Sequence, residues 1–278
     1  MTISQDWTFQ AKNGGVRYVS EYPNAIEKSW VGLLVHGYGE HIGRYRPLAE
    51  ALLAAGATVY GPDHEGHGRS EGARALVEDL ESVSDDLHEV AVHAAQKNPG
   101  LPLVLIGHSL GGLIAARFAQ RFGRELAALV LSAPAFGSRA GVEMLLSMDP
   151  IPPIPIDPAQ LSRDPNVGEA YARDPLVWHG PFKKQTLAAM KQLMDTTENG
   201  PAFDNLPTLW IHGEDDNIVS LPDTRKAVER LKGSQFEYKG YPGGRHENFN
   251  EINRDEVFSD VIGFIQRTLS KRGVVLKK

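Results

Sequence analysis

Ser109 stands where a serine could act as a nucleophile. It lies between Gly107 and Gly111, directly after an apolar run and before a stretch with helical spacing. In the G-x-S-x-G pattern the serine occupies a sharp strand-to-helix turn, and glycines fit beside it because they have no Cβ to clash with the crowded backbone. The pattern predicts a nucleophilic serine. The alternative is a glycine-rich turn in which Ser109 only caps the following helix.

A serine hydroxyl is a weak nucleophile, so a base and an acid must accompany it. In this type of site they follow the serine in the order Asp or Glu, then His. His246, in a glycine-rich loop, is the only histidine in the sequence after residue 216 and is therefore the predicted base. Glu214, Asp215 and Asp216 follow an apolar run at residues 208–212, and position alone leaves the acid open among the three.

Several stretches of the chain resemble the monoacylglycerol lipases and their lysophospholipase-like relatives, which have the α/β-hydrolase fold. Besides the serine pattern and the acidic loop at residues 213–219, the resemblance rests on residues 36–45, 63–72, 161–164 and 171–176. It extends from about residue 30 to 265. In that family the acid stands three residues after the strand-end glycine, which implies Asp216 as the acid.

The predicted chemistry is ester hydrolysis through an acyl-enzyme. Ser109 would attack the carbonyl, His246 would move the proton, and Asp216 would orient the imidazole. The N–H of Leu110, directly after the nucleophile, is expected to stabilise the oxyanion, and the resemblance implies the N–H of Tyr38 as the second donor.

A serine esterase or lipase that converts monoacylglycerol into fatty acid and glycerol is the foremost prediction. A lysophospholipase, a general carboxylesterase or a perhydrolase with the same three residues is the alternative. A non-catalytic ligand-binding module on the same fold is a remote third, because a fold does not decide a function.

The resemblance also implies a site for the alcohol group of the substrate. Glu40, Arg44 and Tyr171 match family residues that hold the glycerol hydroxyls. An ion pair between Glu40 and Arg44 that only braces their loop is the alternative. The fourth family position, a histidine three residues after the base, is Phe249 in this chain and cannot hydrogen-bond.

Apolar runs alternate along the chain with segments of helical spacing, which predicts βαβ units in an α/β protein. With the resemblance, this indicates a mainly parallel eight-stranded sheet with helices on both faces. Residues 5–22 are expected to form an antiparallel edge hairpin. The further strands are predicted at 31–35, 57–61, 103–106, 126–131, 208–212 and 235–241, and the helices at 47–55, 77–94, 110–122, 222–231 and 257–265.

The alternation breaks between residues 136 and 205, which predicts a cap inserted into a core of residues 1–135 and 206–278. Five of the nine residues from 150 to 158 are prolines, which excludes helix interior and central strand there. Ile151 and Ile154 are predicted to line an acyl tunnel, and the cap to touch a lipid surface transiently. The alternative is that these residues pack the cap onto the core.

The amino-acid composition excludes several other classes of protein. A content of 41% apolar residues in 278 is ample for a core, and the net charge of −6 argues against a nucleic-acid partner. The absence of cysteine excludes thiol catalysis. The N-terminal residues show no signal peptide, and no apolar run has the length of a membrane span, which predicts a soluble cytoplasmic protein whose partner is a small lipid ester.

Histidines outside the predicted triad raise the question of a metal site. His64 and His67 follow Asp63, but the glycines between them indicate a turn and no third ligand is apparent. These side chains, and His36 at a strand end, are predicted to brace loops beneath the pocket. No metal and no cofactor are predicted.

Overall fold

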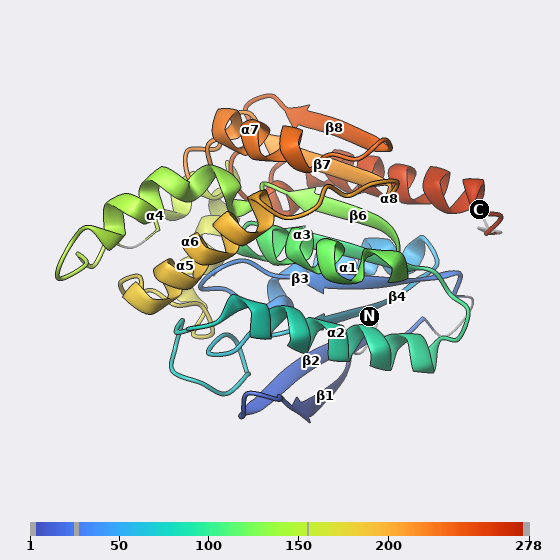
Figure 1. Cartoon of the computed structure of the whole chain (residues 1–278), viewed down its shortest axis with the longest axis horizontal. Coiled ribbons are helices and arrows are strands. Elements are labelled where there is room, and N and C mark those ends of the chain that lie inside the picture. Colours follow the sequence, from blue (N-terminus) through green and yellow to red (C-terminus); the bar gives the residue numbers. More distant parts are fainter. Residues whose placement is uncertain (1–3, 25–27, 155, 275–278) are drawn as a thin grey trace.

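The computed structural model describes residues 4–24, 28–154 and 156–274. Its frame is an eight-stranded sheet in the order β1-β2-β4-β3-β5-β6-β7-β8 (Figure 1). The pairings of β1 with β2 and of β2 with β4 are antiparallel, and all later pairings are parallel, as expected when helices connect the strands. The strands are β1 (Gln5–Gln10), β2 (Val16–Tyr22), β3 (Trp30–Val35), β4 (Ala57–Pro62), β5 (Leu103–His108), β6 (Leu126–Ser132), β7 (Thr208–Gly213) and β8 (Phe236–Tyr241).

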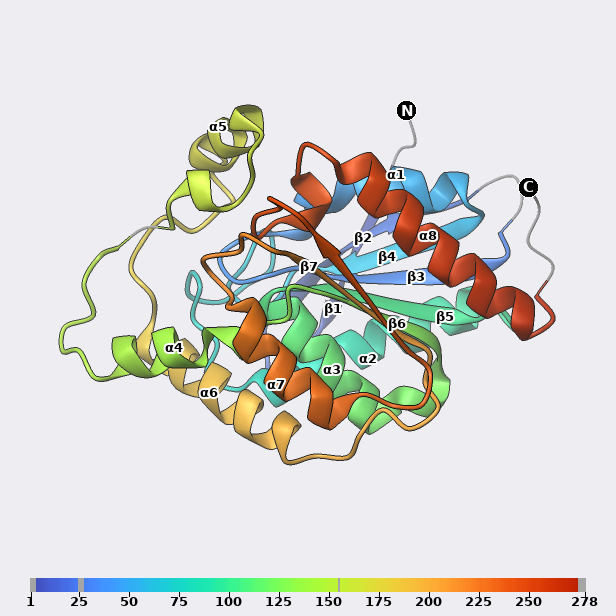
Figure 2. The same cartoon turned by 90° about the horizontal axis from the view of Figure 1, so that it is seen from above.

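Helices cover both faces of this sheet, which confirms the predicted α/β-hydrolase architecture. Helices α1 and α8 pack on one face, and α2, α3 and α7 pack on the other (Figure 2). The central strands β3 to β7 are buried along their whole length. The helices are α1 (Arg46–Ala54), α2 (Leu80–Lys97), α3 (Leu110–Phe122), α4 (Arg139–Leu146), α5 (Pro165–Arg173), α6 (Lys184–Glu198), α7 (Leu221–Leu231) and α8 (Arg254–Lys271).

Two helices differ from the prediction by three residues or more at each end. Helix α2 begins at Leu80 rather than at Val77, because the Asp79 carboxylate accepts the Glu81 N–H and so caps the helix there. Helix α8 extends beyond the predicted 257–265 at both ends, because its first turn is polar and Leu269 continues the buried apolar spacing after Ile265. Of the basic C-terminal tail, residues 275–278 lie outside the described residues.

The segment between β6 and β7 holds α4, α5 and α6 and gathers at one end of the molecule (Figures 1 and 2). Helix α6 contributes Leu187 and Leu193 to the same apolar core as α3, whereas α5 belongs to a small separate cluster of Leu161, Tyr171 and Val177. The described residues of the proline-rich stretch between Leu146 and Pro158 form no helix or strand, as predicted. The exact domain division remains a prediction. No described helix is long and apolar enough to cross a bilayer.

Candidate active site

Ser109 occupies the turn between β5 and α3, as the glycine pattern predicted. Its backbone angles are φ 55° and ψ −120°, a combination that residues other than glycine seldom adopt. A Cβ at Gly107 would lie 2.3 Å from the Gly111 carbonyl oxygen, and a Cβ at Gly111 would lie 2.2 Å from the Val35 carbonyl oxygen. Both positions therefore require glycine for the turn to form against β3.

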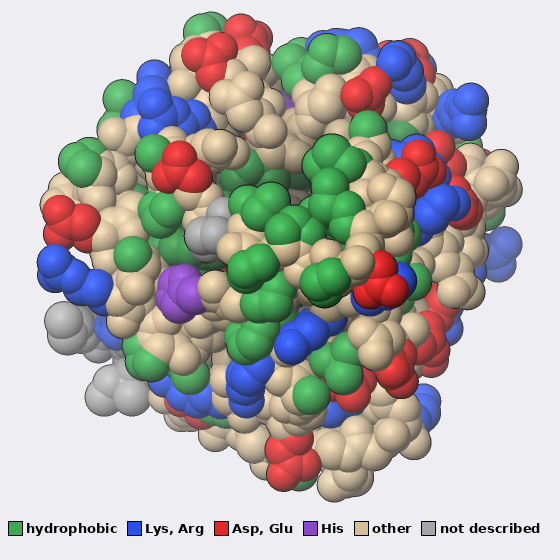
Figure 3. Space-filling model, turned by 90° about the vertical axis from the view of Figure 1, so that its left-hand side faces the viewer, with side chains coloured by type: hydrophobic (Ala, Val, Ile, Leu, Met, Phe, Trp, Pro, Cys, Tyr) green, Lys and Arg blue, Asp and Glu red, His purple; other side chains and the backbone are tan. Residues whose placement is uncertain are grey.

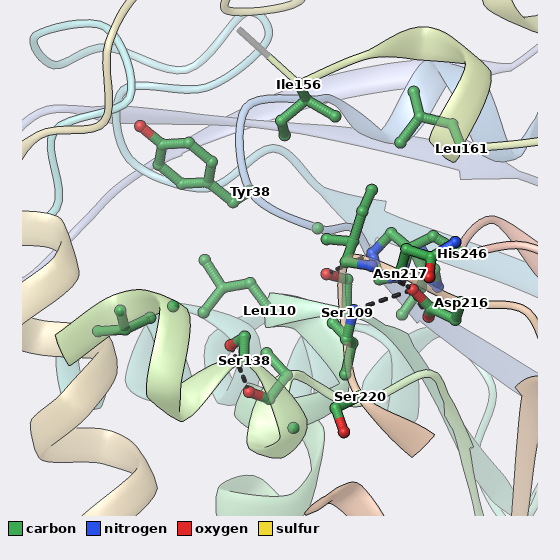
Figure 4. Close-up of a pocket in the computed structure, with 18 of the residues that line it drawn as sticks. Tyr38, Ser109, Leu110, Ser138, Ile156, Leu161, Asp216, Asn217, Ser220 and His246 are labelled. Carbon is green, nitrogen blue, oxygen red and sulfur yellow. Dashed lines mark hydrogen bonds and ion pairs between the residues drawn. The ribbon is translucent and has the colours of Figure 1, made fainter. Parts of the chain in front are cut away.

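His246 and Asp216 meet Ser109 at the carboxyl ends of the parallel strands (Figure 4). The Ser109 Oγ lies 2.9 Å from His246 Nε2, and His246 Nδ1 lies 2.8 Å from Asp216 Oδ2. His246 follows β8 and Asp216 follows β7, so residues far apart in the chain reach one point. The arrangement has the geometry of a hydroxyl, a base and an orienting acid.

The structure brings only one of the three candidate acids to His246. Asp216 is buried, whereas Glu214 and Asp215 are exposed to solvent. The second oxygen of Asp216 accepts the N–H groups of Ile218 and Val219 at 2.8 and 2.9 Å. These bonds hold the carboxylate in the orientation that faces the imidazole.

Nearby charges stabilise an ionised Asp216 beside a protonated His246. Burial would lower the pKa of His246, but the negative charges of Asp216, Glu247 and Glu40 outweigh it and raise that pKa above its ordinary value. Burial would likewise raise the pKa of Asp216, but His246 and His212 hold it well below its usual range. The carboxylate thus stays ionised and stabilises a positive charge on the imidazole.

Two backbone donors lie beside Ser109. A Cβ at Gly37 would lie 3.2 Å from the Ser109 Cβ, so the loop after β3 packs directly on the nucleophile. The N–H of Tyr38 in that loop, and the N–H of Leu110 at the start of α3, have no hydrogen-bond acceptor among the described residues. Both are therefore available to an oxyanion on the Ser109 side.

The histidines beneath this loop brace it, as predicted. His36 Nδ1 lies 2.8 Å from the Gly37 carbonyl oxygen, and its Nε2 accepts the backbone N–H of His64 at 3.0 Å. The His64 ring in turn bonds to the His36 carbonyl oxygen at 2.9 Å. Asp63 accepts the N–H of Ile42 at 2.8 Å, which ties the loop after β4 to the loop after β3. Among the residues that the structure describes, no group of three or more His, Asp or Glu side chains is placed to hold a metal ion.

A cavity of about 650 Å³ opens above Ser109. Figure 4 shows Ser109 and His246 facing a space that Tyr38, Ile156 and Leu161 border. Figure 3 shows hydrophobic side chains around the hollow on this end of the molecule. Most of the wall is apolar. Leu110 at the start of α3 contributes to it, and the rest comes from the β6–β7 insertion and from the segment after β7, with side chains such as Val142, Leu145, Ile156, Leu161, Phe182, Leu187, Met190, Ile218, Val219 and Leu221.

The predicted tunnel residues Ile151 and Ile154 do not line this cavity, so that prediction is wrong. Ile154 is 57% exposed, and Ile151 packs partly against the apolar core. Ile156 lines the cavity instead. Between α4 and Pro158 the chain has no regular structure, so neither residue spacing nor sequence pattern indicates which isoleucine faces inward.

Glu40, Arg44 and Tyr171 all line the cavity, and Glu40 and Arg44 form an ion pair with 2.6 Å between Glu40 Oε2 and Arg44 Nη1. The Arg44 guanidinium lies 5.0 Å from the centre of the Tyr171 ring. The Tyr171 hydroxyl has no hydrogen bond to another described residue.

Glu247 is a further residue of this network that the sequence did not reveal. It follows His246 directly and binds Arg44 through two bonds of 2.7 Å. The sequence offered only one signal for this residue. Glu247 is an acid directly after the predicted base, and the loop of Arg44 contains no acidic residue besides Glu40.

Comparison with known proteins agrees with this geometry. The family described as serine aminopeptidase, S33 matches residues 27–253. A monoacylglycerol lipase of Mycolicibacterium smegmatis is 36% identical over 262 residues, which span 91% of this chain and 94% of the relative. The chain belongs to the monoacylglycerol lipase-like α/β-hydrolases.

More distant members support this assignment. The monoglyceride lipase of Homo sapiens is 30% identical to this α/β-hydrolase, over 85% of this chain and 81% of the human one. The solved structure of a thermostable carboxyl esterase from Bacillus coagulans superimposes with a TM-score of 0.84 at 25% identity, over 96% of this chain and 99% of that one. The family and the fold predicted from the sequence are thereby confirmed.

Proposed function

We propose that this α/β-hydrolase is a serine esterase that cleaves monoacylglycerols into a fatty acid and glycerol. The observation that carries the proposal is the chain of short contacts from Ser109 through His246 to Asp216, at the base of a largely apolar cavity. A hydroxyl activated in this way beside an apolar cavity suits an ester with a long acyl chain.

The proposed reaction proceeds in two halves. Ser109 Oγ attacks the ester carbonyl while His246 Nε2 takes its proton, and the Tyr38 and Leu110 N–H groups hold the oxyanion. The C–O bond to the alcohol then breaks, and His246 returns the proton to the departing oxygen. Water then attacks the acyl carbon while His246 takes its proton, the bond from that carbon to Ser109 Oγ breaks, and His246 returns the proton to Oγ as the fatty acid leaves. Each oxyanion donor is expected to contribute about 3 kcal/mol to transition-state stabilisation.

The charges around the cavity favour a neutral alcohol over a phosphorylated one. Arg44 is the single Lys or Arg side chain among the described residues that line the cavity, and two carboxylates already neutralise it. Glu214 and Asp223 add negative charge to the wall. The phosphate of a lysophospholipid would meet these carboxylates, so glycerol fits better than an anionic head group.

Tyr171 and Arg44 are the proposed contacts for the glycerol hydroxyls. The Tyr171 hydroxyl has no protein partner among the described residues, and of the five N–H donors of a guanidinium, Arg44 uses three on Glu40 and Glu247. Glu40 is less available, because both of its oxygens already accept hydrogen bonds.

The exposed apolar residues of the β6–β7 insertion are the proposed site of transient contact with a lipid surface. Met144 and Ile154 are 54% and 57% exposed on the end of the molecule that holds the cavity. We also propose that residues 136–205 form a cap over the cavity and that the protein is cytoplasmic.

A substrate panel tests the proposal. Monoacylglycerols, lysophospholipids, diacylglycerols and p-nitrophenyl esters are compared by kcat/KM, with Ser109→Ala as the inactive reference. The expected result is the highest kcat/KM on monoacylglycerols. Higher values on lysophospholipids would replace the proposal by a lysophospholipase, and failure of a fluorophosphonate to label Ser109 would exclude a serine hydrolase altogether.

A further inference from the structure

Glu247 lies in the same loop as His246 and connects this loop to the segment after β3, on the opposite side of the site. Its two carboxylate oxygens accept hydrogen bonds from Arg44 Nη1 and Nη2, both at 2.7 Å. The Asn250 amide donates to Glu247 Oε2 at 2.9 Å. The side chains of Arg44 and Glu247 are only 10% and 5% exposed. A planar two-point contact of this kind restricts orientation as well as distance.

Arg44 continues the connection toward the nucleophile. Its Nη1 also donates to Glu40 Oε2 at 2.6 Å. The other oxygen of Glu40 accepts the backbone N–H of Gly37 and the hydroxyl of Tyr45, both at 2.7 Å. Gly37 immediately precedes Tyr38, whose N–H is the proposed oxyanion donor. The path Gly37–Glu40–Arg44–Glu247 therefore connects the oxyanion loop to the residue next to the base.

This connection supplies a restraint that the triad lacks. The Ser109–His246 and His246–Asp216 contacts hold the imidazole, but neither reaches the loop after β3. The oxyanion loop and the histidine loop follow strands β3 and β8, which are not neighbours in the sheet. Catalysis needs both at set distances from one carbonyl group, and a displacement of 1 Å can reduce a rate about 100-fold.

We propose that Glu247, acting through Arg44 and Glu40, is a positioning residue that sets the oxyanion loop relative to His246. The proposal rests on the serine esterase function proposed above. It differs from a head-group role because the predicted defect does not depend on the alcohol. It differs from a purely structural role because it predicts a loss in kcat beyond any loss in stability.

The test uses p-nitrophenyl acetate, whose leaving group has no glycerol hydroxyls. Glu247→Gln keeps the size of the side chain but removes the charge and one of the two acceptor oxygens. We expect kcat to fall about 10- to 100-fold with KM within twofold of wild type. Arg44→Lys, which leaves the buried carboxylates a positive partner but loses the planar fork, is expected to show the same split.

Asp86→Asn is the matched control. Asp86 forms another buried pair with an arginine, 2.7 Å from Arg17 Nε, under the β1–β2 hairpin and away from the site. It should lower the melting temperature but leave kcat on p-nitrophenyl acetate unchanged. Should Glu247→Gln prove too unstable to purify, Arg44→Lys decides the question by the same kinetic split.

The outcomes separate this proposal from the one on which it rests. If both variants keep kcat within twofold of wild type, or lose activity only through KM, the positioning role is overturned. If wild type itself neither hydrolyses the esters nor reacts with a fluorophosphonate, the serine esterase proposal fails instead. Reduced kcat in the two variants together with unchanged kcat in Asp86→Asn supports the positioning role.

Discussion

At the scale of single residues, Ser109 holds the one backbone conformation on which the site depends. A non-glycine residue at φ 55° costs about 1–3 kcal/mol. The surrounding backbone offsets this strain, since the Ser109 N–H donates to the Ser132 carbonyl at 2.9 Å and the Ser109 carbonyl accepts the Ala135 N–H at 3.0 Å. The hydroxyl is thereby held out of the helix and toward His246.

Removing any member of the triad should abolish most of the activity without unfolding the protein. Ser109→Ala, His246→Ala and Asp216→Asn are each expected to lower kcat by about 10⁴-fold or more, because the three groups act as a unit. Steady-state kinetics and a melting curve check this. Asp215→Asn is the control, since Asp215 is exposed, and full inactivation by Asp215→Asn with normal activity in Asp216→Asn would refute the assignment of the acid.

The proposed head-group contact is tested by removing one hydroxyl. Tyr171→Phe keeps the ring that lies beside Arg44 and deletes only the oxygen. We expect kcat/KM on a monoacylglycerol to fall about fivefold, the value of one hydrogen bond, with no change on the matching methyl ester. An equal loss on both esters would show that Tyr171 supports the site without binding the alcohol.

At the scale of secondary-structure elements, the site depends on where the parallel strands end. Strands β3, β5, β7 and β8 run in the same direction, so the loops that follow them meet at one edge of the sheet. The insertion between β6 and β7 covers this edge. Its contacts with the oxyanion loop include a bond of 2.7 Å from the Trp178 N–H to the Gly39 carbonyl and stacking of Phe182 on Tyr38.

The proline-rich connection after α4 should affect acyl-chain selectivity. Replacing residues 147–157 by a glycine-serine linker of equal length removes Ile156 from the cavity wall and the exposed Ile154 from the surface. We expect a fall in kcat/KM on long-chain monoacylglycerols, at about 0.8 kcal/mol for each methylene no longer buried. The rate on p-nitrophenyl acetate should remain. Equal losses on both substrates would show that the segment only braces the fold.

At the scale of the whole molecule, buried neutral histidines determine how the protein responds to acid. Burial lowers the pKa of His64 and His108 to about 3 and that of His67 to about 4, and it also lowers the pKa of His36. In the unfolded chain these groups regain a pKa of about 6.5 and bind protons that the folded protein excludes. Their contribution to the free energy of unfolding is therefore fully present above about pH 6.5 and is lost as the pH falls toward 4.

The free energy of unfolding should consequently decrease by about 1.4 kcal/mol per pH unit for each of these histidines as the pH falls from about 6 toward 4. His246 acts in the opposite direction, because its raised pKa favours the folded state at low pH, but it is one group against four. Urea unfolding at about pH 7.5 and pH 5 checks this. His108→Asn should reduce the slope by the share of one histidine, and a stability independent of pH over this range would contradict the prediction.

The family, the sheet and the order of the predicted triad could be recognised from the sequence alone. An apolar strand that ends at Gly107 before Ser109 is a local pattern, and local patterns are legible because neighbouring residues share one strand or one turn. Because only one histidine follows residue 216, His246 was the predicted base by elimination. The resemblance to the lipases supplied Asp216 and Tyr38.

Which side chains meet across the site became clear only from the folded chain. Glu247 and Arg44 are 203 residues apart, and nothing in their spacing indicates that they pair. Ile156 rather than Ile151 or Ile154 faces the cavity because an irregular, proline-rich chain has no period that assigns a residue to a face. Long-range contacts and the orientation of irregular segments depend on the packing of whole elements, which no short stretch of sequence contains.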